Sequence, residues 1–166
     1  MSIREFISNL MLRAASRAAV TWSPLPIRLI VGYGFMAHGF AKLSRGPEAF
    51  ALILDTLGVP LPLLMSWATT VVELAGGAAV LLGIGIPLVA PPMAVVLLTA
   101  LFTVHYRYGF FSVKLAHVGD DGVRFGTVGY EIILLYLAGL AALVIGGPGR
   151  LSLEAWIRRT GLSRGG

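Results

Sequence analysis

Residues 61–84 read LPLLMSWATTVVELAGGAAVLLGI, an apolar run in which Glu73 is the only charged residue. About twenty apolar residues are enough for a helix to cross the hydrocarbon core of a bilayer. This run therefore predicts a membrane-spanning helix. Comparable apolar runs cover about 27–43, 87–106 and 128–145. Four such segments predict an all-α membrane protein, built as a bundle of four transmembrane helices.

The composition of the 166-residue chain agrees with this class. Hydrophobic residues make up 57% of the chain and charged residues only 13%, whereas about a quarter of the residues are charged in a soluble domain. We expect one transmembrane domain, 23–149, between a segment 1–22 and a short cytoplasmic tail, 150–166. The chain contains no cysteine, which excludes disulfides, thiolate nucleophiles and cysteine-held iron–sulfur clusters within it.

Most of the positive charge lies at the two ends of the chain. Neither cluster is interleaved with aromatic residues that stack on bases, so we expect no nucleic-acid partner. Cytoplasmic segments of membrane proteins carry an excess of Lys and Arg, and an even number of spans places both termini on one side. We therefore expect both termini in the cytoplasm. The arginines concerned are Arg4, Arg13, Arg17, Arg150, Arg158, Arg159 and Arg164.

The segments outside the four spans have patterns of their own. The apolar spacing in 3–20 predicts an N-terminal amphipathic helix lying at the membrane interface. The loop 44–62 is expected to hold one short helix that begins at Pro47 and stops at Gly58. The polar stretch 107–126 predicts the largest loop outside the membrane, and Ser152 is expected to cap a last short helix.

The proline-rich third segment leaves one alternative open. Pro91 and Pro92 interrupt the hydrogen bonding of a helix, which is tolerated where neighbouring helices cover the freed carbonyls. A chain of three spans, with the third segment re-entrant, is therefore the alternative to four spans.

Ionisable residues inside spans are costly and often mark functional sites. From the helical rise, His38 and Glu73 are expected near the midplane, with Lys42 one turn from His38. Arg28 is expected to extend its side chain to the inner interface or to a lipid phosphate. The other groups should gather in the outer half of the bundle, where opposite charges meet. These are His38, Lys42, Glu73, His105 and Glu131.

Each of these residues also has a structural interpretation. A histidine in a span is often one partner of an interhelical hydrogen bond, and Glu73 is explained by an ion pair alone. Glycines at 76 and 77 allow a close helix approach and favour an inward-facing carboxylate. His38 and His105 are expected at different depths, so a haem between them is not predicted. No metal-ligand spacing is present, so no metal site is predicted.

Six short motifs, taken together, resemble the DoxX family of small bacterial membrane proteins. The resemblance extends from Arg28 to Glu154, with Glu154 and Phe111 as departures from the family pattern. It implies a multi-pass protein of the bacterial cytoplasmic (inner) membrane. Relatives include a subunit associated with a terminal quinol oxidase and a thiosulfate:quinone oxidoreductase. The motifs are HGFAKL at 38–43, VELAGG at 72–77, FTVH at 102–105, GFFSVKL at 109–115, GYE at 129–131 and GPG at 147–149.

The first functional hypothesis is a quinone-interacting subunit of a membrane redox system. Its electrons would come from a partner protein. The residues expected to transfer protons are Glu73, His38, Lys42 and Glu131. The alternative is a non-enzymatic small transporter or an assembly scaffold, in which the polar cluster is structural. Under both hypotheses the protein lies in the lipid bilayer, where it can form a homo-oligomer. The residues expected to line or support the quinone pocket are His38, Lys42, Glu73, His105, Tyr130 and Glu131.

Overall fold

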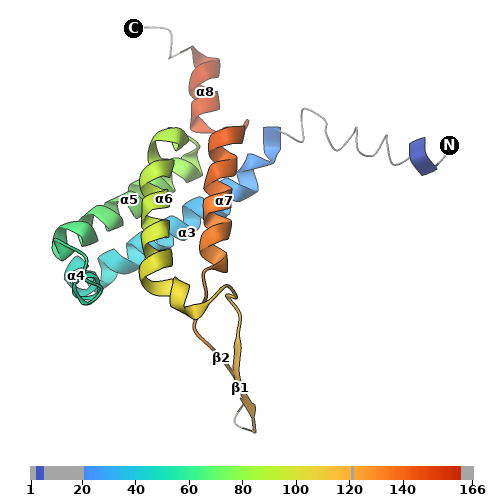
Figure 1. The fold of residues 1–166 in the computed structure, drawn as a ribbon. Coiled ribbons are helices and arrows are strands. Elements are labelled where there is room, and N and C mark those ends of the chain that lie inside the picture. Colours follow the sequence, from blue (N-terminus) through green and yellow to red (C-terminus); the bar gives the residue numbers. More distant parts are fainter. Residues whose placement is uncertain (1–2, 6–20, 121, 162–166) are drawn as a thin grey trace.

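The computed structural model describes residues 3–5, 21–120 and 122–161. Helix occurs in each of the four ranges that the sequence marked as spans (Figure 1). The predicted amphipathic helix at 1–22 lies mostly outside the described residues, as does the end of the tail. The four long helices are α3 (Pro24–Arg45), α5 (Pro62–Leu82), α6 (Ile86–Ala100) and α7 (Glu131–Gly146).

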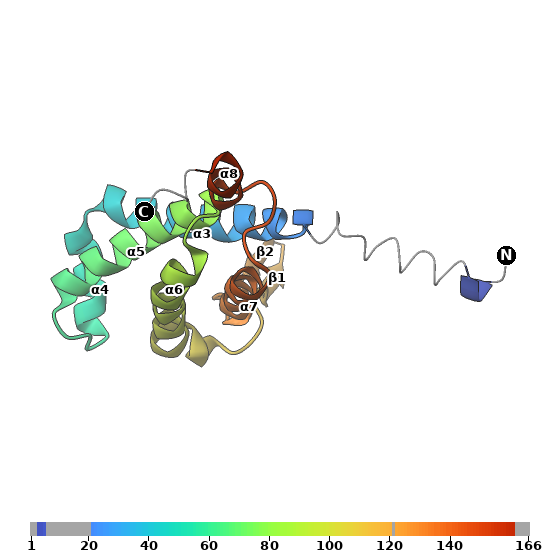
Figure 2. The same ribbon diagram turned by 90° about the horizontal axis from the view of Figure 1, so that it is seen from above.

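The four helices form a ring in which α3 packs against α5 and α7, and α6 packs against the same two helices. α3 and α5 run side by side and are inclined to α6 and α7, as the two views show (Figures 1 and 2). The beginning of α3 and the end of α7 lie at the same end of the bundle, because the backbone N–H of Arg150 donates to the carbonyl of Thr21 at 3.0 Å. This arrangement agrees with an even number of crossings.

Two segments, Pro62–Leu82 and Ile86–Tyr108, are each long and apolar enough to cross a membrane. The helix α7 is apolar but shorter. The helix α3 carries Arg28, Lys42 and Arg45 within its 22 residues. That all four helices cross the membrane therefore stays a prediction.

Glycines bring α3 and α5 into close contact. A Cβ atom added to Gly77 would lie 2.8 Å from the carbonyl oxygen of Gly32, and one added to Gly76 would lie 2.8 Å from the sulfur of Met93 on α6. The glycines beside Glu73 thus permit the close approach that the sequence predicted. All four helices contribute to the buried core, whose members are Val31, Phe35, Val80, Ile86, Ala90, Met93, Leu140 and Leu143.

The third long segment stays helical through its prolines. Pro91 and Pro92 lie inside α6, which continues into a π-helical turn, Leu101–His105, and a 3₁₀ turn, Tyr106–Tyr108. The continuous helical path from 86 to 108 agrees with a crossing segment rather than with a re-entrant one. The π turn accommodates an extra residue in the helical ladder, a feature that recurs at functional sites.

Two short helices confirm sequence predictions. The helix α4 (Pro47–Thr56) has proline in its first turn, Glu48 near its positive end and Gly58 two residues after it. The helix α8 (Leu153–Thr160) is capped by Ser152, whose hydroxyl accepts a hydrogen bond from the backbone N–H of Ala155 at 3.1 Å.

The loop 107–126 differs from the wholly helical expectation, because it contains a two-stranded antiparallel hairpin. Strands β1 (Leu115–Gly119) and β2 (Gly122–Phe125) pair in it, and Gly119 faces Gly122 next to the turn. Valines and a phenylalanine favour strand geometry, and glycines permit the tight connection. The hairpin is exposed and extends away from the helices (Figure 1).

Arg28 corrects the expectation that its side chain extends to the interface. It is only 2% exposed and binds backbone carbonyls inside the protein. Its Nε donates to the carbonyl of Val80 at 3.0 Å, and its two terminal nitrogens donate to three others. Arg28 therefore joins the last turn of α5 to the segment after α7. The three other acceptors are the carbonyls of Leu81, Pro148 and Leu151.

Candidate functional site

The central feature of the candidate site is an ion pair between α3 and α5. The Nζ of Lys42 lies 2.6 Å from Oε1 of Glu73. Glu73 is 5% exposed, because α3 approaches α5 closely at Gly39, where an added Cβ would lie 3.0 Å from the Cβ of Glu73. The sequence expectation that opposite charges meet inside the bundle is confirmed for these two residues.

The short helix α4 covers this ion pair. The ring of Phe50 lies 4.3 Å from the Lys42 nitrogen, measured to the ring centroid, which is a cation–π distance. The first residue of α4 is held by Ser66, whose hydroxyl donates to the carbonyl of Pro47 at 2.7 Å. The loop 46–61 thus places a helix, with its aromatic ring, over a buried charge.

A line of buried polar side chains runs along one face of α5. Ser66, Thr70 and Glu73 follow each other at spacings of four and three residues, which places them on the same helix face, and all three are buried. The hydroxyl of Thr70 donates to the carbonyl of Ser66 at 2.8 Å. The hydroxyls of Ser66 and Thr70 thus donate their hydrogen bonds within the protein.

One oxygen of Glu73 has no partner. Its Oε2 is buried and makes no hydrogen bond, the only such side-chain atom in the part of the chain that the structure describes. Buried polar atoms are nearly always hydrogen-bonded, and an exception calls for an explanation. A carboxylate oxygen in this position can accept a hydrogen bond from a ligand.

His38 lies near the pair in sequence but faces elsewhere. It stands one turn before Lys42 on α3, and its side chain is exposed on the surface of the bundle. Residues four apart on a helix differ in direction by roughly 40°. Lys42 lies at the edge of the contact with α5, so this difference is enough to direct His38 outward.

The remaining predicted residues form a second cluster at the end of the third segment and the beginning of α7. The Oε2 of Glu131 accepts a hydrogen bond from the backbone N–H of Ser112 at 3.0 Å. His105 Nδ1 lies 3.0 Å from the carbonyl oxygen of Val128 and acts as the donor there. The ring of Tyr130 stacks on Tyr106 with centroids 6.1 Å apart. These partners are backbone groups and rings, so this cluster mainly orders the loop.

The loop 109–112 is held against the first turn of α7 by backbone hydrogen bonds. Gly129, Tyr130 and Glu131 donate to the carbonyls of Phe111, Gly109 and Phe110, at 3.0, 3.1 and 2.9 Å respectively. Only glycine fits at position 129. An added Cβ would lie 2.2 Å from the carbonyl oxygen of Gly109.

The substitution Gly129→Ala is therefore expected to detach this loop. The clash is with backbone atoms, so relief requires movement of the loop, at a cost of about 2 kcal/mol or more. We expect faster tryptic cleavage after Lys114 and a lower midpoint of thermal unfolding. Gly126→Ala is the matched control, because its added Cβ would have only ordinary contacts, the nearest at 3.7 Å. Equal proteolysis of the two variants would contradict this interpretation.

The two clusters lie in different parts of the molecule. The Lys42–Glu73 pair lies next to α4, whose Phe50 ring contacts Lys42, whereas the second cluster joins the segment before the hairpin to the segment after it. Figures 1 and 2 show α4 apart from the base of the hairpin. The six residues that the sequence assigned to one pocket are thus divided into an ion pair, a loop cluster and the exposed His38. Their roles in chemistry stay predictions.

Sequence reasoning did not find Phe50, Ser66 or Thr70. A signal for the two hydroxyls was present, because their spacing from Glu73 places all three on one helix face. For Phe50 there was none, since its position depends on how α4 folds back. Within 3–5, 21–120 and 122–161, the structure brings together no group of three or more His, Asp or Glu side chains that could hold a metal ion.

Comparison with known proteins gives one match. The family model described as DoxX matches residues 23–106, which is just over half of the chain and includes α3, α4, α5 and α6. No curated protein and no solved structure matches. The match includes Lys42, Phe50 and Glu73, while Tyr130 and Glu131 lie beyond it.

Proposed function

Since the chain belongs to the DoxX family of membrane proteins, we propose that it is a quinone-interacting subunit of a membrane redox system. We place it in the bacterial cytoplasmic membrane with four crossings and both termini in the cytoplasm. The proposed site is the Lys42–Glu73 pair under α4. Its electrons come from a partner protein, because the chain has no cysteine for a thiol relay.

The observation that carries this proposal is the unpaired Oε2 of the buried Glu73. A quinone ring presents carbonyl oxygens, which accept hydrogen bonds, and its reduced form presents hydroxyls, which donate them. The ammonium group of Lys42 has three N–H donors and suits the carbonyl form. The free carboxylate oxygen suits the hydroxyl form. Lys42 and Glu73 together therefore offer a hydrogen-bond partner to both the oxidised and the reduced quinone.

The free oxygen also places Glu73 for proton exchange with a ligand. A side chain within hydrogen-bond reach of a reacting group can act as its general acid or base, and Oε2 is the atom available for this. The ligand approaches from the side of Lys42, whose side chain is 18% exposed against 6% for Glu73. The aromatic ring of Phe50 adds an apolar surface on which a quinone ring can stack.

The test compares two glutamine variants of the full chain in their content of bound quinone. Glu73→Gln is expected to lose most of the quinone that co-purifies with the protein or is added to it in detergent, because the amide lacks the negative charge and cannot exchange a proton with the ligand. Glu131→Gln is the matched control, since it makes the same change in the other cluster. Quinone is measured by organic extraction and chromatography, and an absorption spectrum tests for haem. Equal quinone content in both variants and in the parent protein would refute the proposal.

The non-enzymatic alternative, a small transporter or an assembly scaffold, explains the ion pair as a link between α3 and α5. It gives no reason for the unpaired oxygen. If Glu73→Gln lowers the midpoint of thermal unfolding and its quinone content only follows the folded fraction, the scaffold function is supported. A variant that melts like the parent protein but binds no quinone favours the redox subunit.

A further inference from the structure

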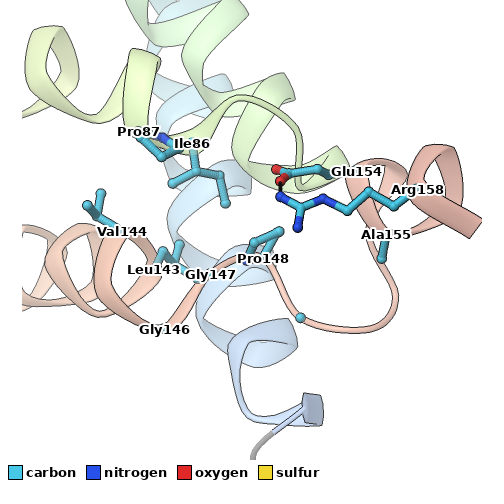
Figure 3. A pocket seen from close by; sticks show the side chains of 11 residues that line it. Ile86, Pro87, Leu143, Val144, Gly146, Gly147, Pro148, Glu154, Ala155 and Arg158 are labelled. Carbon is cyan, nitrogen blue, oxygen red and sulfur yellow. Dashed lines mark hydrogen bonds and ion pairs between the residues drawn. The ribbon is translucent and has the colours of Figure 1, made fainter. Parts of the chain in front are cut away.

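A second place for a ligand lies at the end of the bundle where α3 begins and α7 ends. A cavity of about 400 Å³ opens between the first turn of α6, the last turn of α7 and the helix α8 (Figure 3). Its wall toward the helices is apolar and includes Ile86, Pro87, Leu143 and Val144, and its rim carries Glu154 and Arg158. The cavity is thus amphiphilic, with hydrocarbon on one side and charges on the other.

The two rim charges belong to one ion pair. Arg158 Nη2 contacts Oε1 of Glu154 one turn away on α8, as Figure 3 shows. The side chain of Arg158 is 74% exposed and that of Glu154 is 29% exposed. An exposed pair of this kind contributes little to stability. A ligand with both a negative and a positive group can therefore replace each partner at little cost.

The position of the cavity fits the headgroup layer of a membrane. It is bounded by the ends of α6 and α7, where apolar helices leave the hydrocarbon region. Trp156 of α8 is 54% exposed at the same end, and tryptophan is enriched at membrane–water interfaces. A molecule bound here meets lipid tails on one side and water on the other.

We propose that this cavity binds a zwitterionic aminophospholipid of the phosphatidylethanolamine type. Its phosphate binds the guanidinium of Arg158, its primary ammonium binds the carboxylate of Glu154, and its acyl chains follow Pro87 and Val144 into the bilayer. A lipid with only a negative headgroup leaves Glu154 next to a like charge. A choline headgroup carries a positive charge but has no N–H group to donate to that carboxylate.

The experiment measures lipid binding to the full chain by native mass spectrometry in detergent. Phosphatidylethanolamine, phosphatidylcholine and phosphatidylglycerol with identical acyl chains are added at equal concentrations. We expect roughly tenfold more bound phosphatidylethanolamine than phosphatidylcholine. Glu154→Gln should remove this preference, and Arg158→Gln should weaken binding of all three lipids. Arg159→Gln is the control, because Arg159 lies outside the cavity lining and donates to the carbonyl of Arg150.

Three results would overturn the proposal. They are equal binding of the three lipids to the parent protein, a preference for phosphatidylglycerol, and a preference for phosphatidylethanolamine that survives Glu154→Gln. Because Glu154 and Arg158 form a surface pair, the variants are expected to fold. Their helix content by circular dichroism checks this. A variant that fails the check is replaced by the exchange Glu154→Arg with Arg158→Glu, which retains both charges and should retain the preference.

Discussion

Replacing Arg28 with glutamine is expected to lower the midpoint of thermal unfolding in detergent by roughly 10 °C. The guanidinium is buried and donates to four carbonyls. A glutamine amide is shorter and has two donors, so at least two of these carbonyls lose their partner. Each buried acceptor left unpaired costs about 1–3 kcal/mol. For a chain of this size that loss corresponds to a large shift in the midpoint.

The control for this prediction is Arg45→Gln. Arg45 is the last residue of α3 and is exposed, so its replacement removes one positive charge from the same helix without leaving a buried group unpaired. We expect its midpoint to stay within about 2 °C of the parent protein. Arg28→Lys should fall between the two, since an ammonium retains the charge but cannot reach four carbonyls in different directions. Similar midpoints for Arg28→Gln and Arg45→Gln would contradict the structural role of Arg28.

Replacing Lys42 with methionine is expected to destabilise the fold by about 3–5 kcal/mol. Methionine fills a similar volume but leaves Glu73 buried without its positive partner. Removing one member of a buried pair costs more than the pair itself contributes, because the remaining charge is uncompensated. The measurement is the midpoint of thermal unfolding, or the denaturant concentration at half unfolding, in the same detergent.

The double variant Lys42→Met with Glu73→Gln separates this explanation from simple loss of packing. It removes both charges, so most of the lost stability should return. If the double variant is as unstable as Lys42→Met alone, the loss comes from the contact of the Lys42 ammonium group with the ring of Phe50 rather than from the unpaired carboxylate. A Lys42→Met variant with unchanged stability would show that the ion pair does not form.

The sequence was sufficient to predict the helices and an inward-facing Glu73 in a region where opposite charges meet. Apolar length placed a helix in each of the four ranges, and glycines beside Glu73 indicated an inward-facing carboxylate. Lys42 was expected in the same half of the bundle as Glu73 but was not assigned to it as a partner. The antiparallel order of α3 and α5 makes it the partner, because it brings the end of one helix beside the middle of the other. These predictions rest on periodicity and depth, which are properties of single helices.

The environment of Arg28 was beyond the sequence because its partners are backbone carbonyls. The carbonyls of Pro148 and Leu151 lie more than a hundred residues away along the chain, and every residue has a carbonyl. No residue type marks which of them will converge. Burial of this arginine follows from the arrangement of the ends of α5 and α7, which a one-dimensional pattern does not contain.

The sequence also could not predict that the six residues assigned to one pocket lie in separate clusters, and the reason is similar. Depth alone placed His105 and Glu131 in the same outer half of the bundle as Glu73, but it does not say which side of a helix each one occupies. The inclination of α3 and α5 to α6 and α7 separates the two clusters. The hairpin could have been predicted, since valines flank a turn with glycines at both of its ends, at 119 and 122.

The central claim, that quinone binds at Lys42 and Glu73 beneath α4, is tested most directly by photoaffinity labelling. The full chain in detergent is illuminated with an azidoquinone, and the labelled peptides are identified by mass spectrometry. We predict labels within 42–50 and 66–77, lost in the presence of excess unlabelled quinone and in Glu73→Gln. Competed labelling confined to 105–131, or labelling unchanged in Glu73→Gln, would contradict the claim.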